Sequence, residues 1–357
     1  MDGGLTFALQ RTASRAGRSS RLAYAMKRMS ASLALMLIFG ALFALPAAQG
    51  QEKGKAYRLG YLNSTNPTIN APWLNAFRQG LRELGWIEGQ NISIDYRWAD
   101  GKDERLAGLA SELVKLRVDI IVTSGNAGVR AAREASGAIP IIAATFTDPI
   151  GTGLAATLAR PGGNITGLAT QFEALVTKQQ QFLKEMLPNA ARVAILVPPA
   201  AGFSAYARTI PPAAVSAAQA LGVEARVIEV QDEAAIDGTL AAAKREGVDA
   251  IHVLPGPFFV RHRTKLVESA LKHRLPAVYE LKVFVDAGGL IAYGPNFASM
   301  YHRAAGYVDR ILKGAKPGEL PIEQPTKFEL VINLKTAKAL GLKIPQSLLL
   351  RADQVVE

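Results

Sequence analysis

The sequence predicts an α/β protein of two lobes, each built around a parallel sheet. From Tyr57 onward, short apolar runs alternate with longer amphipathic segments, which is typical of βαβ units. Several of these runs are apolar throughout, as strands covered on both faces should be. In total the chain has about ten predicted strands. This number is too large for one compact doubly wound domain, so we predict two sheets of about five strands each.

The predicted strands follow one another along the whole chain beyond residue 56. They occupy 57–63, 92–98, 119–124, 140–146, 165–170, 192–198, 225–230, 249–254, 276–281 and 289–293. Helices are predicted between them. In 72–85, Leu74, Phe77, Leu81 and Leu84 recur at helical spacing, and 299–313 shows the same periodicity. A further helix is predicted at 127–136, directly after the third strand.

Three connections between the lobes are predicted from glycine and proline. The first lies near Gly162-Gly163, the second around Gly288-Gly289, and the third in the Pro/Gly-rich segment 314–325. We therefore expect an N-terminal lobe made of 57–166 and 290–322. The C-terminal lobe would comprise 167–289 and 323–357. Such a molecule is expected to hinge around a cleft between the two lobes.

The N-terminal region has the layout of a secretory signal peptide. Lys27 and Arg28 precede 13 apolar residues at 33–45, and Ala48 and Gly50 supply small residues before a cut at Gln51. A membrane span needs about 20 residues, so we favour cleavage near Gly50 over a retained anchor. The Arg-rich residues 1–25 add nothing to this signal, and translation is expected to begin at Met26 or Met29. The mature protein is then expected in the periplasm, without stable membrane insertion.

Composition excludes several classes of function. Beyond residue 50 the chain holds 35 Lys/Arg and 29 Asp/Glu, a formal charge of +6, and these basic residues are scattered, so no nucleic-acid partner is expected. The absence of cysteine excludes disulfides, thiol chemistry, Cys-ligated metals and an N-terminal lipidated Cys. The sequence contains no HExxH, GxSxG or Walker motif. We therefore expect no catalytic residues, no metal and no cofactor.

Polar residues gather where predicted strands end, and ligands bind beyond the carboxyl ends of parallel strands. The candidates come from the ends of the first, third and fourth predicted strands and from the first crossing. Three further places in the second lobe also contribute. The candidates are Asn63, Ser64, Thr123, Ser124, Gly125, Asn126, Ala127, Thr145, Phe146, Thr147, Asp148, Gln171, Phe172, Phe203, Tyr279, Glu280 and Tyr293. Each residue taken alone has another interpretation, as a helix cap, a turn former or a packed side chain.

Taken together, these residue types suit an amino acid or a related small carboxylate or amide. The N–H groups of 125–127 and the Ser124 hydroxyl suit a carboxylate at the start of a helix. Asp148 could receive the ligand ammonium. Phe146 or Phe172 could cover an apolar or aromatic side group.

Four motifs carry a resemblance to a known family. They are FRQGLRELGWIEGQNISIDYRWADG at 77–101, IPIIAATFTDPIGTGLAATLARPGGNITGLA at 139–169, GGLIAYGPN at 288–296, and the block 307–357. In this order and spacing they resemble the ABC transporter substrate-binding family that includes TrpX-type tryptophan-binding proteins. The resemblance implies a type I periplasmic-binding-protein fold: two Rossmann-like lobes, three crossovers and hinge closure on a ligand. The resemblance also implies an ABC permease and an ATPase as partners. Residues 123–127 and Asp148 correspond to ligand-site positions of that family.

The sequence therefore favours a monomeric periplasmic protein that captures a small organic ligand for an ABC importer. A sensory module for a membrane receptor would use the same fold, and so would a periplasmic enzyme. A LacI-type repressor also shares the two-lobe architecture. It would need an N-terminal helix-turn-helix, and this chain has the predicted signal peptide in that place.

Overall fold

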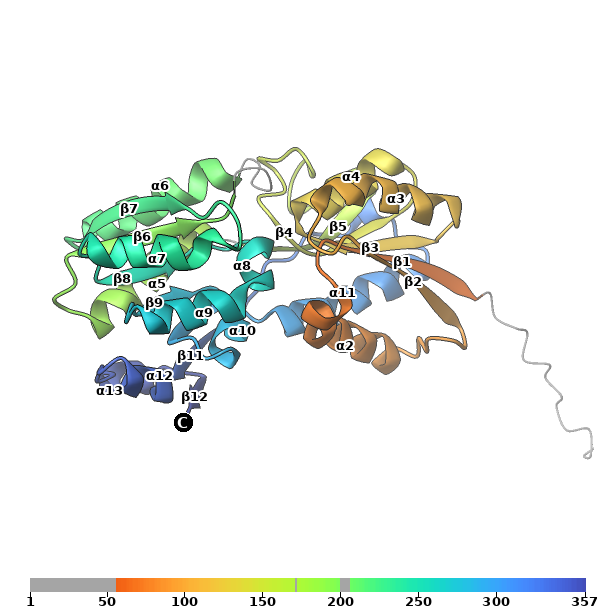
Figure 1. Cartoon of the computed structure of the whole chain (residues 1–357). Helices are drawn as coiled ribbons and strands as arrows, with labels where there is room; N and C mark the ends of the chain where they lie inside the picture. Colours follow the sequence, from red (N-terminus) through yellow and green to blue (C-terminus); the bar gives the residue numbers. More distant parts are fainter. Residues whose placement is uncertain (1–55, 171, 200–205) are drawn as a thin grey trace, which may run out of the picture. The chain divides into compact units, whose positions relative to one another are not determined.

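The computed structural model describes residues 56–170, 172–199 and 206–357 (Figure 1). The predicted signal peptide, Gln171 and Phe203 lie outside these residues. The described chain forms a five-stranded sheet and a seven-stranded sheet, which confirms the α/β fold with two sheets. Within the described residues, no helix is both long enough and apolar enough to cross a bilayer.

The first sheet is parallel throughout and has the strand order β2-β1-β3-β4-β5. Figure 1 shows α3 and α4 over one face and α2 and α11 over the other. The apolar side chains agree, because Leu62 and Ile121 cluster with α3 and α4, whereas Leu59 and Tyr61 cluster with α2 and α11. The elements are β1 (Tyr57–Asn63), α2 (Pro67–Glu83), β2 (Ile92–Trp98), η1 (Asp103–Arg105), α3 (Leu106–Lys115), β3 (Ile120–Ser124), α4 (Gly125–Ala135), β4 (Ile141–Thr147), β5 (Ile165–Thr170) and α11 (Phe297–Leu312).

The second sheet has the order β12-β11-β10-β9-β8-β6-β7, and only its β10–β11 pair is antiparallel. Val193 and Ile195 cluster with α5 and α6, whereas Ala194 and Leu196 cluster with α7 to α10, so helices cover both faces. The elements are α5 (Phe172–Met186), β6 (Arg192–Val197), α6 (Tyr206–Ala220), β7 (Glu224–Glu229), α7 (Ala235–Arg245), β8 (Ala250–Val253), α8 (Pro257–Arg261), α9 (Arg263–Lys272), β9 (Ala277–Tyr279), α10 (Lys282–Asp286), β10 (Ile291–Pro295), β11 (Phe328–Asn333), α12 (Leu334–Ala339), α13 (Gln346–Leu349) and β12 (Gln354–Val356). The short helix η3 (Pro317–Glu319) lies beside β5 in the first lobe.

The crossings between the two lobes lie later in the chain than the glycine pairs indicated. β5 pairs with β4 of the first sheet, so the first crossing follows Thr170. β10 pairs with β9 and β11 of the second sheet, so the second crossing lies between Pro295 and α11. The third comes after Glu323, whose backbone still bonds to β5. Gly162 and Gly288 have positive φ angles of 72° and 100° and form turns inside a lobe.

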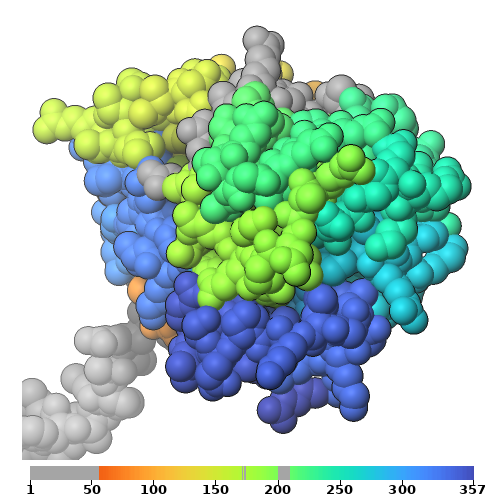
Figure 2. Space-filling view, turned by 90° about the vertical axis from the view of Figure 1, so that its left-hand side faces the viewer, coloured from red at the N-terminus to blue at the C-terminus, as the bar shows by residue number. Residues whose placement is uncertain are grey.

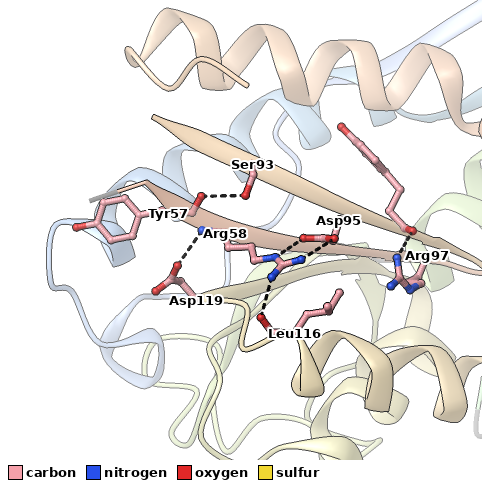
Figure 3. A network of polar contacts seen from close by, with 8 residues as sticks. Tyr57, Arg58, Ser93, Asp95, Arg97, Leu116 and Asp119 are labelled. Atoms are coloured by element: carbon pink, nitrogen blue, oxygen red, sulfur yellow. Dashed lines mark hydrogen bonds and ion pairs between the residues drawn. The ribbon is translucent and has the colours of Figure 1, made fainter. Parts of the chain in front are cut away.

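A polar network fixes the pairing of β1 with its neighbours (Figure 3). The Arg58 guanidinium donates to the Asp95 carboxylate on β2 and to the Leu116 carbonyl before β3. The Arg58 backbone N–H donates to Asp119 Oδ2 at 2.8 Å. The hydrogen bond from Arg58 lowers the pKa of Asp95 below its ordinary value. These contacts join three neighbouring strands at the end of the sheet opposite the cavity described below.

The C-terminal segment is tied to the second lobe through α5. Glu185 accepts a hydrogen bond from the Ser347 hydroxyl at 2.8 Å and forms an ion pair with Arg351. Figure 2 shows this segment, dark blue, beside the yellow-green part of the chain that includes α5. The last residues of the chain are thus held against the second sheet's helices.

Candidate ligand-binding site

A cavity of about 600 Å³ lies at the carboxyl ends of strands from both sheets. The first lobe contributes the ends of β1, β3 and β4, and the second contributes the segments after β8 and β9. Most of the residues predicted from the sequence take part in its wall. Those are Asn63, Ser64, Ser124, Gly125, Asn126, Ala127, Thr145, Phe146, Thr147, Phe172 and Glu280.

Asn63 organises the polar side of this cavity. Its Nδ2 donates to Ser124 Oγ at 2.9 Å, and its Oδ1 accepts from the backbone N–H and the hydroxyl of Thr65. Asn63 is buried, so these bonds form away from competing water. They hold the Ser124 hydroxyl at the beginning of α4.

The N-terminus of α4 opens onto the cavity. Ser124 is its N-cap residue, and its side chain makes no capping hydrogen bond to the helix. The N–H groups of the first helical turn have no intrahelical acceptor, and the helix dipole places partial positive charge there. The Asn126 side chain bonds in both directions to the backbone of Thr147, which ties this end of α4 to β4. The arrangement can receive a carboxylate.

Aromatic side chains form the apolar side of the cavity. Trp73 of α2 stacks on Tyr301 of α11, with ring centroids 6.0 Å apart, and meets Phe297 edge-on at 5.6 Å. Phe146 and Phe172 complete the aromatic lining from the first lobe's edge and the first crossing. This surface fits an apolar or aromatic group of a ligand.

Glu280 brings an acidic side chain into the wall from the second lobe. It follows β9 and is only 4% exposed. Within the described part of the chain, its carboxylate has no hydrogen bond and no ion pair. Burial raises the pKa of Glu280 well above its ordinary value. A buried carboxyl without a partner is therefore available to a cationic group of a ligand.

Asp148, the residue expected to face a ligand amine, lies elsewhere. It is exposed, has a positive φ of 42°, and its Oδ1 accepts the Gly151 N–H at 2.9 Å. It lines a smaller adjoining cavity of about 410 Å³ and not the main one. The turn after β4 uses the carboxylate of Asp148 as a local cap, which directs it away from the main cavity.

Three other predicted residues lie behind the wall or in the cores. Thr123 is buried against α4, where a Cβ at Gly128 would come within 2.3 Å of its hydroxyl. Tyr279 stacks on Phe284 with centroids 4.8 Å apart. Tyr293 packs edge-on against Phe182 at 5.0 Å. These contacts are structural.

Sequence reasoning missed the part of the site contributed by helices. Asn70, Trp73, Phe297 and Tyr301 line the cavity from α2 and α11. The Tyr61 hydroxyl donates to Asn70 Oδ1 at 2.6 Å, and Asn70 Nδ2 has no partner among the described residues. Helical periodicity in the sequence indicated that α2 and α11 each have an apolar face. It did not indicate that the first turns of these helices reach a ligand cavity. The described residues also contain no cluster of His, Asp and Glu that could hold a metal.

Comparisons with known proteins identify the family of this chain. Residues 71–356 match the family model described as ABC transporter substrate binding protein. A tyrosine-binding protein of Clostridioides difficile is 24% identical over 268 residues, covering 75% of this chain and 76% of that protein.

Solved structures show the same fold. An ABC domain from Streptococcus pneumonia in complex with L-Trp superposes with a TM-score of 0.77 at 25% identity, covering 85% of this chain and 100% of that one. A glucose-galactose binding protein from Geobacillus stearothermophilus, 12% identical, gives a TM-score of 0.58 over 78% of this chain and 98% of its own. The predicted type I periplasmic-binding-protein fold is thus confirmed. The relatives are binding proteins, which agrees with the expectation that the chain is not an enzyme. With the family model spanning most of its length, this chain belongs to the ABC transporter substrate-binding protein family.

Proposed function

We propose that this protein is the periplasmic solute-binding component of an ABC importer and that its ligand is an amino acid with an aromatic or apolar side group. One observation carries the proposal. A single cavity combines the N-terminus of α4 from the first lobe, the unpartnered carboxyl of Glu280 from the second lobe, and an aromatic wall. These features match the carboxylate, the ammonium and the side group of an amino acid.

The carboxylate would bind at the start of α4. The Ser124 hydroxyl and the N–H groups of 125–127 supply neutral donors with the helix dipole behind them. Asn70 Nδ2, which has no partner among the described residues, would add a further donor to an acceptor atom of the ligand. No cationic side chain is needed for this interaction.

The ammonium would pair with Glu280, which takes the role that the sequence alone assigned to Asp148. Both partners of such a pair lose water on binding, so a charge left unpaired there is costly. Removing one partner of a buried, hydrogen-bonded charge pair typically costs about 2–5 kcal/mol. Glu280 is then the largest single contributor to ligand selectivity in our proposal.

The side group would pack against Trp73, Phe297 and Tyr301. Aromatic residues bury large areas with few rotatable bonds, and they favour planar partners. The relatives support an aromatic ligand, since one is named a tyrosine-binding protein and another was solved with L-Trp. Tyrosine, tryptophan and phenylalanine are accordingly the first ligands to test.

Ligand binding would favour the closed arrangement of the lobes. A ligand that contacts Ser124 on one lobe and Glu280 on the other can make both contacts only when the two lobes are close together. The closed protein would then deliver the ligand to an ABC permease and ATPase. The predicted signal peptide supports a periplasmic site of action, and a monomer is sufficient for this mechanism.

The test is a binding screen of the chain that starts at Gln51. Thermal unfolding is measured with the twenty common amino acids, aromatic acids, amides and sugars, and hits are followed by calorimetry. A ligand at 100 times its Kd should add about 2.7 kcal/mol of stability. Recovery of the ligand unchanged would agree with binding alone. Binding of sugars with no response to any amino acid would overturn the proposal.

A further inference from the structure

We propose that Glu280 makes ligand capture proton-linked: the residue is ionised opposite a ligand ammonium and must carry a proton when the bound ligand lacks one. The inference rests on the proposed function and specifies how the same site would distinguish an amino acid from its des-amino analogue. Both ligands have the same carboxylate and the same side group. They differ only in the group that would meet Glu280.

The surroundings of Glu280 carry this inference. The residue lines the cavity, is 4% exposed, and has no polar partner among the described residues. Taking an ionised carboxylate out of water without a partner is so costly that such groups usually become neutral instead. β10 approaches so closely that a Cβ at Gly294 would lie 2.0 Å from the Glu280 carbonyl oxygen. The same Cβ would lie 3.5 Å from the Glu280 Cγ, so β10 packs directly against this residue.

Nearby charged groups do not neutralise Glu280. On α10, Lys282 forms an ion pair with Asp286, and on β11, Glu329 accepts from Asn296 Nδ2 at 3.1 Å. Tyr279 of β9 is enclosed against Phe284. The other titratable or charged residues of the cavity wall are Asp103, Glu104, Arg130, Glu134 and Tyr301. Burial is the cause of the raised pKa of Glu280, with no charged neighbour contributing.

The two ligand classes should consequently respond to pH in different ways. An amino acid supplies the cation itself, so its complex contains ionised Glu280. A des-amino acid supplies none, so its complex contains one more proton, on Glu280. The ratio of the two dissociation constants should change by up to about tenfold per pH unit, with the amino acid increasingly favoured as pH rises. This ratio does not depend on the protonation of the ligand-free protein.

The experiment uses calorimetry with two matched pairs of probes. L-Tyrosine is compared with 3-(4-hydroxyphenyl)propionate, and L-tryptophan with indole-3-propionate, between about pH 5.5 and about pH 7, where the ammonium and both carboxylates keep their charge. Buffers of different ionisation enthalpy count the protons exchanged. We expect the two complexes of a pair to differ by up to one proton. Equal proton counts and a ratio independent of pH would overturn the inference.

Glu280→Gln provides the second measurement. Its amide is neutral at every pH, so the pH dependence of the ratio should disappear. Amino-acid affinity should fall by at least about 30-fold relative to the wild type. Des-amino acids should bind the variant with affinities independent of pH. A des-amino acid that binds neither protein at any pH would overturn the inference.

The matched control is Glu329→Gln, the same chemical change on β11 of the same sheet and outside the cavity wall. It should leave the pH dependence of the ratio as in the wild type, and thermal unfolding confirms that both variants fold. The two proposals fail in different ways. If no amino acid binds the wild type, the proposed function fails. If L-tyrosine or L-tryptophan binds wild type and Glu280→Gln equally, only the role of Glu280 fails.

Discussion

At the residue scale, the sequence located acidic residues at strand ends but did not distinguish their surroundings. Asp148 and Glu280 both follow a strand. The first is exposed and bonded to Gly151, and the second is buried without a partner among the described residues. The difference arises from the turn after β4 and from the position of the second lobe, which are long-range properties. Residues on β1 and β3 were easier to predict, because parallel strand ends always share one edge.

Asp148→Asn tests this reassignment directly. The amide oxygen of Asn can still accept the Gly151 N–H, and Asn tolerates the positive φ at this position. Amino-acid affinity measured by calorimetry should therefore stay within about twofold of the wild type, since only a local turn contact changes. A loss of more than tenfold would show that Asp148 reaches the ligand after all.

At the element scale, periodicity predicted the existence of the helices well and their beginnings less well. The helix expected at 72–85 begins at Pro67, capped by Asn66, and continues through Pro72. Proline inside a helix is normally a boundary signal. Here tertiary packing overrides it, because α2 lies against α11 over much of its length and shares the aromatic wall with it. Contacts between elements far apart in sequence are not visible in the local pattern.

The lack of space around Gly80 shows that α2 and α11 pack closely. A Cβ at this position would come within 2.5 Å of the His302 carbonyl oxygen on α11. Gly80→Ala should lower the free energy of unfolding by about 1–3 kcal/mol, as overpacking does. Gly108→Ala is the control, since Gly108 is an exposed residue of α3 with open space around it. That change should stabilise by about 0.5–1 kcal/mol in chemical denaturation. Equal effects of the two changes would contradict close packing of α2 on α11.

A second element-scale feature joins α5 to the second sheet through a buried histidine. His252 Nε2 lies 2.7 Å from Gln179 Oε1, His252 Nδ1 lies 2.9 Å from Gln180 Nε2, and Gln179 Nε2 donates to the Tyr293 carbonyl. Burial lowers the pKa of His252 to about 3. The sequence placed His252 in a strand, and the glutamines of α5 gave no sign of reaching it.

This network predicts a defined acid sensitivity. Below pH 6.5 the unfolded chain binds a proton at residue 252, whereas the folded chain does not until about pH 3. The free energy of unfolding should fall with decreasing pH across this window, by up to about 1.4 kcal/mol per unit from this group. In His252→Gln that contribution is absent, so its denaturation midpoint should fall less steeply with acid. Parallel slopes for the two proteins would contradict a neutral buried His252.

At the scale of the whole described chain, the two-sheet architecture could be predicted because it depends on counting and alternation. The lobe boundaries were displaced because glycine pairs mark turns equally well inside a lobe, as the positive φ angles of Gly162 and Gly288 show. Residues of the shared cavity wall from both lobes were among the candidates, but the pairing of loops across the cavity could not be predicted. It depends on which loops of one lobe meet which loops of the other, and no local pattern encodes that.

One such meeting point is formed by Arg261 and Gly101, which are not part of the cavity wall. The Arg261 guanidinium of α8 lies against Gly101 of the first lobe, where a Cβ would come within 1.5 Å of Nη1. Burial raises the pKa of Asp103, and the charge of Arg261 opposes that rise. The Gly101 N–H donates to the Ser64 carbonyl at 2.6 Å, so this contact joins Arg261 to the loop that carries part of the site.

Arg261→Ala should therefore weaken amino-acid binding without touching the ligand. A partly exposed charge contact contributes modestly, so we expect an affinity loss of about two- to fivefold, seen mainly as faster dissociation in stopped-flow measurements. Arg263→Ala is the matched control, since Arg263 donates to the Val260 carbonyl within its own lobe. High salt should reduce the difference between wild type and Arg261→Ala, because the attraction between Arg261 and Asp103 is electrostatic. Equal dissociation rates for wild type and both variants would mean that the contact near Gly101 does not stabilise the closed state, and that the ligand alone holds the lobes together.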